Sequence, residues 1–209
     1  DRGHSEVAVL MKSEQSAFHF LIVFFDSIWY HFSWSGVISL ARKMAQYQRN
    51  FETSIGMSNR NFQKIVSFYL FECPVAGKSK RGKKFDDYGI KGQAAFARLK
   101  KAMLLNATTS LQNNYLPCRQ NELSSAFERV KSIAPTDEYC VFLKYDEKTV
   151  MQSLYSAIRN AFAHGSFSVK TYSGVRIYFF ANFDGYLKAE IILHEDTLLS
   201  WIDCIKSFE

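Results

Sequence analysis

Apolar residues recur at spacings of three and four through the first third of the chain, from about residue 6 to residue 71. This period places them on one face of an α-helix, and helices are therefore expected there. Breaks at Ser35-Gly36 and Gly56 divide the segment into three helices, with Ser58 as the expected N-cap of the third. The first third is therefore expected to be entirely helical.

Turn residues and apolar patterns divide the rest of the chain. Gly-rich residues 74–92 predict a mobile surface loop, and Asp-Gly between alternating apolar runs predicts a hairpin at residues 184–185. After the loop, the expected elements are helices over 93–111 and 121–133, a short apolar patch at 139–143, a helix capped by Asp146 and stopped by Gly165, strands over 166–172, 175–182 and 186–193, and a helix from Asp196.

Together these elements predict a mainly α fold, a helical bundle with a small antiparallel β-meander near the C-terminus. All 209 residues are expected to form a single domain. Its expected parts are N-terminal helices over 1–73, a basic loop over 74–92, helices over 93–165 and the meander with a final helix over 166–209.

Composition narrows the classes of function. The net charge is +6 and the pI is near 9.1, which favours a polyanionic partner. The apolar run at 17–25 is too short to span a bilayer, so we expect no membrane association and a cytoplasmic protein. Cofactors and metals are not expected, because the cysteines are far apart and no His or Cys stands at metal-site spacing; the four are expected to be free thiols: Cys73, Cys118, Cys140 and Cys204.

Residues 159–164, Arg-Asn-Ala-Phe-Ala-His, bring a cation, an amide and an imidazole to the expected end of a helix. Asn160 and His164 are four residues apart and share a helix face. Arg159 lies about 140° around the axis from His164. Two copies related by a two-fold axis would supply both groups to one site. The alternative is that these side chains only cap the helix end.

This string, followed by Gly165, resembles the signature of the HEPN superfamily: an Arg, a polar residue and, after a short spacer, a His at a helix end. Arg159, Asn160 and His164 match it. The hairpin meander and the Trp-containing last helix look like a plasmid-encoded HEPN branch, so the resemblance covers about residues 145–209. It implies a helical bundle that forms homodimers and cleaves RNA without a metal, the ribose 2′-hydroxyl attacking the adjacent phosphodiester.

In that mechanism His164 transfers protons, because imidazole titrates near neutrality. Arg159 stabilises charge on the phosphate, and Asn160 orients the His or a phosphate oxygen. The resemblance implies a bacterial toxin or defence effector that is paired with an antitoxin or inhibitor protein. Two alternatives remain open: a catalytically silent HEPN-like module that binds RNA or a partner, and a helical interaction protein whose motif only ends the helix.

The loop contributes a second candidate, a group of RNA-binding cations: Lys78, Lys80, Arg81, Lys83 and Lys84. A solvated linker explains the same charges equally well. Gly77-Lys78-Ser79 does not make a nucleotide-binding loop, because a second Gly and a strand are missing.

Three further features are expected to be structural. His19 and His31 are expected in a helical core, and His194-Glu195-Asp196 is expected to cap the last helix. The aromatic run at 178–180 and Phe183 are expected to pack against the bundle, rather than to stack on bases.

Overall fold

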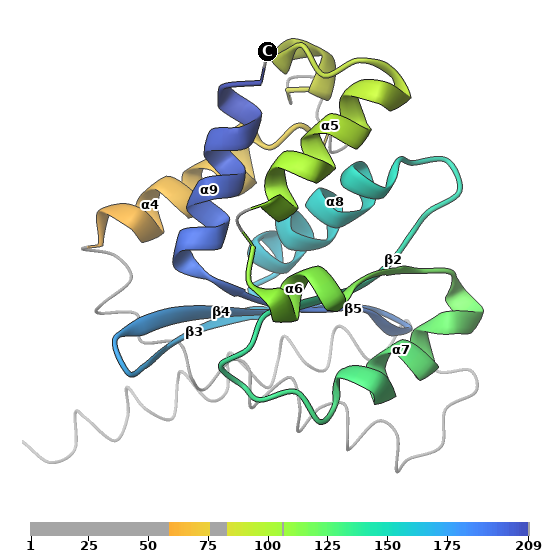
Figure 1. Ribbon diagram of the computed structural model, residues 1–209, viewed down its shortest axis with the longest axis vertical. Helices are drawn as coiled ribbons and strands as arrows, with labels where there is room; N and C mark the ends of the chain where they lie inside the picture. The colour runs from red at the N-terminus through yellow and green to blue at the C-terminus, as the bar shows by residue number, and fades with distance from the viewer. Residues whose placement is uncertain (1–58, 76–82, 106, 209) are drawn as a thin grey trace, which may run out of the picture. The chain divides into compact units, whose positions relative to one another are not determined.

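The computed structural model describes residues 59–75, 83–105 and 107–208, which belong to one compact unit built around a five-stranded sheet (Figure 1). The strand order is β1-β2-β5-β4-β3. The strands are β1 (Tyr115–Cys118), β2 (Tyr139–Leu143), β3 (Phe167–Tyr172), β4 (Val175–Asp184) and β5 (Tyr186–His194). The helices expected within residues 6–58, and His19 and His31 with them, lie outside the described residues.

The expectation of a mainly α bundle is wrong, because the described chain folds as a mixed α/β structure. Strands β3, β4 and β5 form an antiparallel meander close to the predicted positions. Two more strands extend it: β2 pairs antiparallel with β5, and β1 pairs parallel with β2. The connection between the two parallel strands contains α7 (Leu123–Val130).

The sequence does not mark β2 as a strand, because both faces of β2 are buried. Cys140 and Phe142 pack into one hydrophobic cluster, whereas Tyr139 and Val141 pack into another on the opposite face. A strand covered on both faces is a continuous apolar run without the alternation that marks a half-exposed strand. The apolar patch at 139–143 therefore lacks the apolar–polar alternation that would predict a strand.

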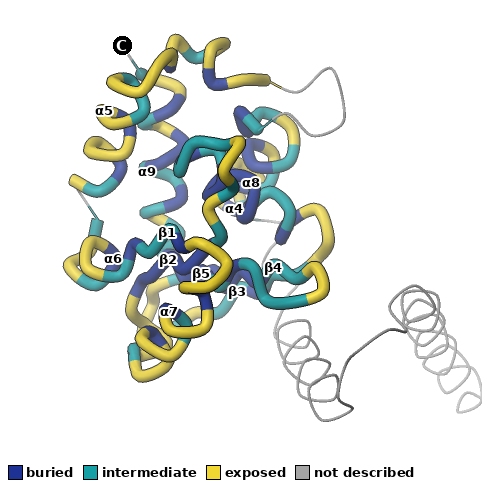
Figure 2. Tube along the Cα trace, turned by 90° about the vertical axis from the view of Figure 1, so that its right-hand side faces the viewer, coloured by how far each residue is buried: buried dark blue, intermediate teal, exposed yellow. Residues whose placement is uncertain are grey.

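Helices cover both faces of the sheet (Figure 1). On one face lie α4 (Arg60–Ser67), α8 (Val150–Ala163) and α9 (Glu195–Lys206), with α5 (Gly92–Leu105) packed against α9. Their apolar side chains and those of the facing strand residues form the first core. Helix α7 covers the other face over a smaller second core. Figure 2 shows α8 mostly buried and the strands buried or half-buried along most of their length, while α5 and α7 carry exposed turns.

Several predicted helices are shorter than expected or interrupted. The helix expected over 93–111 is divided into α5 and α6 (Thr109–Asn113), because the Thr108 side chain caps a new helix by accepting from the Leu111 N–H. The helix expected over 121–133 is a short 3₁₀ turn, η3 (Gln120–Glu122), followed by α7. Asn59 caps α4, which continues as a π-helical turn, η1 (Phe68–Glu72).

The aromatic run 178–180 of β4 packs in the two cores, as the sequence predicts, whereas Phe183 is half-buried and belongs to neither core. Tyr178 and Phe180 belong to the first core and Phe179 to the second. The Tyr178 hydroxyl donates to Glu195 Oε2 at 3.0 Å, which ties β4 to the first turn of α9. These rings are therefore structural.

Tyr69 of η1 occupies the centre of the first core with a hydroxyl that has no hydrogen-bond partner among the described residues. Its ring stacks on Tyr155 and Phe162, with centroids 5.8 and 5.9 Å away. Burial raises the pKa of Tyr69 well above its usual value, so the hydroxyl stays neutral. An unsatisfied buried hydroxyl costs stability while its ring contributes packing.

We expect Tyr69→Phe to raise the free energy of unfolding by about 1 kcal/mol, because the variant removes only the unsatisfied hydroxyl. The matched control is Tyr178→Phe, which loses a hydrogen bond to a carboxylate and should lower it by about 1.5–3 kcal/mol. Urea denaturation measures both values. A clear loss of stability in Tyr69→Phe would show that the hydroxyl has a partner.

Candidate functional site

The candidate motif lies at the C-terminal end of α8, the helix that contributes most to the first core. The helix begins after Thr149, not Asp146 as the sequence suggested. The Thr149 hydroxyl accepts from the Gln152 N–H at 3.2 Å, and the Gln152 side chain accepts from the Thr149 N–H at 2.8 Å. This capping box outcompetes Asp146 because it satisfies two backbone donors at once.

Around the axis of α8, apolar residues occupy one side and polar or small residues occupy an arc of about 140°, at ~100° per residue. We define the polar arc as Thr149, Gln152, Ser153, Ser156, Arg159, Asn160, Ala163 and His164. Ser153 and Ser156 are buried, Arg159 and Asn160 are half-buried, and His164 is exposed. The arc therefore emerges from the core toward the C-terminal end of the helix.

The backbone itself closes this helix end. The N–H of His164 donates to the Asn160 carbonyl at 2.9 Å, and the N–H of Ser166 donates to the Ala161 carbonyl at 2.8 Å. Gly165 makes the turn possible, because its φ of 65° lies in the left-handed region. The side chains of Arg159, Asn160 and His164 make no hydrogen bond or ion pair to another described residue. They are therefore not the caps of this helix.

Arg159 and His164 stand at opposite margins of the polar arc, with Asn160 between them. Their Cα atoms are separated by roughly 7.5 Å along the axis and about 140° around it. One chain thus presents a cation and an imidazole on either side of an amide and the small side chain of Ala163.

The packing of η1 against α8 brings one end of the basic loop close to the Arg159 margin. The Cys73 thiol donates to the Tyr155 carbonyl, one turn before Arg159, at 4.0 Å. Burial raises the pKa of the Cys73 thiol, and the nearby Arg159 guanidinium partly offsets this rise. Beside Cys73, the Glu72 carboxylate lies 4.0 Å from Lys83 Nζ.

Lys83 and Lys84 are the only predicted RNA-binding cations among the described residues, since Lys78, Lys80 and Arg81 lie outside them. Lys83 is already engaged, because its ammonium also lies 5.0 Å from the centre of the Tyr88 ring. Lys84 is exposed and precedes η2 (Phe85–Tyr88). Their role in binding RNA remains a prediction.

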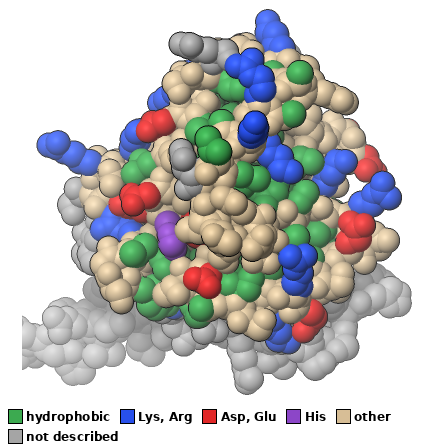
Figure 3. Space-filling model, in the orientation of Figure 1, with side chains coloured by type: hydrophobic (Ala, Val, Ile, Leu, Met, Phe, Trp, Pro, Cys, Tyr) green, Lys and Arg blue, Asp and Glu red, His purple; other side chains and the backbone are tan. Residues whose placement is uncertain are grey.

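The cationic residues do not gather on the face shown in Figure 3, where Lys and Arg side chains alternate with acidic and apolar ones. Among residues 59–75, 83–105 and 107–208, no three His, Cys, Asp or Glu side chains form a group that could hold a metal ion. No helix within these ranges is both long and apolar enough to cross a membrane.

The cysteines offer no activated nucleophile. All four are free thiols. Burial raises the pKa of Cys73, Cys118, Cys140 and Cys204. Because the thiolate is the reactive form, these thiols stay protonated and unreactive at neutral pH.

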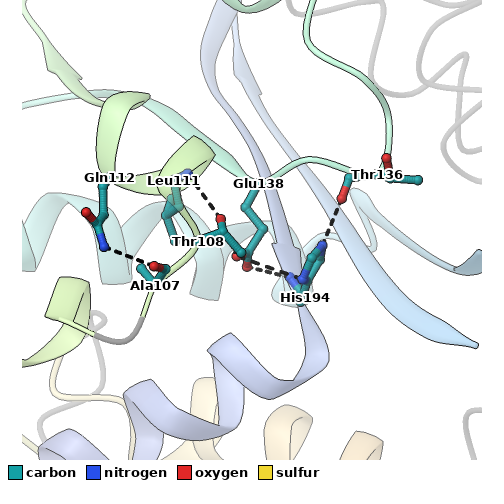
Figure 4. A network of polar contacts seen from close by, with 7 residues as sticks. All are labelled: Ala107, Thr108, Leu111, Gln112, Thr136, Glu138 and His194. Atoms are coloured by element: carbon teal, nitrogen blue, oxygen red, sulfur yellow. Dashed lines mark hydrogen bonds and ion pairs between the residues drawn. The ribbon is translucent and has the colours of Figure 1, made fainter.

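A second histidine has a carboxylate neighbour, as catalytic histidines often do. His194, the N-cap residue of α9, lies beside Glu138, a fully buried residue (Figure 4). Its Nδ1 is 3.9 Å from Glu138 Oε2, and its Nε2 is 2.8 Å from the Thr136 carbonyl. A carbonyl only accepts, so Nε2 carries the hydrogen of this contact and donates it to the Thr136 carbonyl rather than to a substrate.

The Glu138 carboxylate is instead a junction of the fold. Oε1 accepts from the His194 backbone N–H at 2.8 Å, and Oε2 accepts from the Thr108 hydroxyl at 2.9 Å. It thereby joins the segments before β2, α6 and α9. The sequence predicts His194-Glu195-Asp196 as the cap of a helix from Asp196; α9 begins one residue earlier, with His194 as its N-cap residue and Glu195 and Asp196 in its first turn. The sequence does not reveal Glu138, which is 56 residues from His194.

We expect Glu138→Ala to lower the free energy of unfolding by about 3 kcal/mol, because a buried N–H and a hydroxyl lose their acceptor. Asp137→Ala, which removes the adjacent exposed carboxylate, is the matched control and should change stability by less than about 0.5 kcal/mol. Chemical denaturation followed by circular dichroism measures both. Equal stability of the two variants would contradict the junction role.

In comparisons with known proteins, no family model, no curated protein and no solved structure matches the chain.

Proposed function

We propose that this protein is a metal-independent endoribonuclease whose reacting groups lie at the C-terminal end of α8. The proposal rests on the observation that the side chains of Arg159, Asn160 and His164 are left unpartnered by the rest of the described chain. They share one polar arc, and they have no structural partner among the described residues, although the helix end is already closed by the backbone. Side chains that the fold does not use are available for a ligand.

The chemistry of the three side chains suits cleavage of an RNA phosphodiester by the neighbouring 2′-hydroxyl. His164 is exposed, so its imidazole can take the proton of a ribose 2′-hydroxyl as that oxygen attacks the adjacent phosphorus. The bond from phosphorus to the 5′-oxygen then breaks, the leaving oxygen takes a proton, and a 2′,3′-cyclic phosphate remains. Arg159 supplies forked donors to the phosphate oxygens, and Asn160 stands between the two.

The HEPN resemblance supports this proposal through its motif only. The described chain has a mixed sheet where the family resemblance implied a helical bundle. Because unrelated folds can present the same reacting groups, a function is argued from the site itself. The proposal therefore rests on the three side chains and not on the architecture around them.

Incubation of the purified protein with end-labelled RNA in EDTA tests the proposal. We expect cleavage that leaves 2′,3′-cyclic phosphate ends and that spares a 2′-O-methylated substrate. His164→Ala should reduce the rate by about 10²–10⁴-fold, and Arg159→Ala by about 10²–10³-fold, since each removes a transition-state contact. Lys101→Ala, which removes an exposed cation of α5, is the matched control and should cleave like wild type.

Two outcomes would overturn the mechanism: a requirement for a divalent ion, or undiminished cleavage by His164→Ala. RNA binding without any cleavage by the wild type would instead show the catalytically silent binding module.

The 140° separation of Arg159 and His164 supports a site shared by two copies, each giving one margin of its polar arc. Mixing inactive Arg159→Ala with inactive His164→Ala should then restore up to about a quarter of wild-type activity, because half of randomly mixed dimers hold one intact site of two. If the mixture stays inactive while the wild type cleaves, both groups act within one chain.

A toxin or defence role, controlled by an inhibitor protein, belongs to the same proposal. Uncontrolled RNA cleavage would halt bacterial growth, so induced wild-type protein should stop growth and His164→Ala should not.

A further inference from the structure

The polar arc of α8 continues beyond the three motif residues toward the N-terminal end of the helix. Ser156 lies four residues before Asn160 and eight before His164, so the three side chains follow one another along the same side. Ser156 is 8% exposed and Ser153 is fully buried. A helix that packs in a hydrophobic core thus keeps a row of hydroxyls that leads to the proposed site.

Lys148, in the turn before α8, reaches into this row. Its ammonium donates to Ser156 Oγ at 3.4 Å and lies 4.8 Å from the centre of the Tyr145 ring. The side chain is half-buried. It forms no ion pair with a described carboxylate, although the exposed Asp146 and Glu147 precede it directly. One hydroxyl uses one of its three donors, which leaves the charge unneutralised.

The backbone that carries Lys148 is held in place. The Lys148 N–H donates to the Tyr145 carbonyl at 3.1 Å, and the Tyr145 N–H donates to Ser153 Oγ at 3.2 Å. The capping box at Thr149 follows immediately. A cation on a fixed turn loses less conformational entropy on binding an anion than a lysine in a flexible segment does.

Some half-buried cations of the described chain pair with a carboxylate, whereas Lys148, Arg159 and Lys170 do not, and Lys170 lies on strand β3, away from α8. Arg176 pairs with Glu195 at 2.9 Å, and Lys188 pairs with Asp184 at 2.5 Å. Lys148 and Arg159 have no such carboxylate, and Ser156 separates them along α8: Lys148 touches it, and Arg159 lies one turn later. Two unneutralised cations therefore flank one hydroxyl on the polar arc.

We propose that Lys148 and Ser156 bind a second backbone phosphate of the RNA, next to the phosphate that reacts at Arg159 and His164. This inference rests on the proposed function and adds a binding position to it. Ser156 lies roughly 12 Å before His164 along the axis, at 1.5 Å per residue. An extended RNA strand covers that length within about two nucleotides, so one strand can contact both positions.

Binding of a fluorescent 12-nucleotide RNA, measured by anisotropy over a series of salt concentrations, tests this position. Substrate with 2′-O-methyl groups prevents cleavage during the measurement. We expect Lys148→Met to weaken binding about five- to tenfold at 50 mM salt and to reduce the slope of log K against log salt by about 0.7, the value for one phosphate contact on a single strand. Lys148→Arg should restore most of the affinity.

Lys144→Met is the matched control, because Lys144 is an exposed cation four residues earlier. It should bind within about twofold of wild type with an unchanged slope, as expected of a residue that contacts no phosphate. Reductive methylation of the wild-type protein gives a second measurement that no folding defect can affect: bound RNA should protect Lys148 and leave Lys144 reactive.

The outcomes separate the two proposals. The second phosphate position is overturned if Lys148→Met binds RNA like wild type and bound RNA does not protect Lys148 of the wild-type protein. In that case the proposed function still stands if Arg159→Ala impairs binding or cleavage. A wild-type protein that neither binds nor cleaves RNA overturns the proposed function, and the second position with it.

Discussion

The burial of α8 between the sheet and the helical layer is the constraint on which the rest of this structure depends. Leu154, Ile158 and Phe162 lie on its apolar side and are almost completely buried. Phe162 also contacts the rings of Tyr69, Phe167 and Phe180, which come from η1, β3 and β4. Because close-packed side chains hold the helix on this side, the orientation of its opposite, polar arc is set as well.

That orientation explains how a structural element can carry a site. The apolar side of α8 and the capping box at Thr149 contribute stability, so the C-terminal part of the polar arc is free to hold groups that add none. The backbone turn at Gly165 closes the helix without help from Arg159, Asn160 or His164. A rigid helix in a core is also a more precise support for reacting groups than a loop.

The two histidines of the described chain illustrate how context divides similar side chains between roles. His194 is held by Thr136 and lies beside the buried Glu138, so both ring nitrogens face protein atoms. His164 is exposed and has no partner among the described residues. A carboxylate next to an imidazole is thus a weaker sign of catalysis here than an imidazole that the fold leaves free.

Local patterns in the sequence determined the elements whose signals are local. The meander of β3 to β5 follows from alternation and turn residues, and the end of α8 follows from Gly165. The sequence likewise shows the motif 159–164 and its spacing around a helix.

Tertiary structure alone decided the rest. Strands β1 and β2 show no period that marks them as strands, and the contact of Glu138 with His194 joins residues that are 56 positions apart and that only the packed sheet brings together. Each backbone hydrogen bond between β2 and β5 joins residues about fifty positions apart. No local period in the sequence encodes such long-range pairing, and this is why the chain forms a mixed sheet where a bundle was expected.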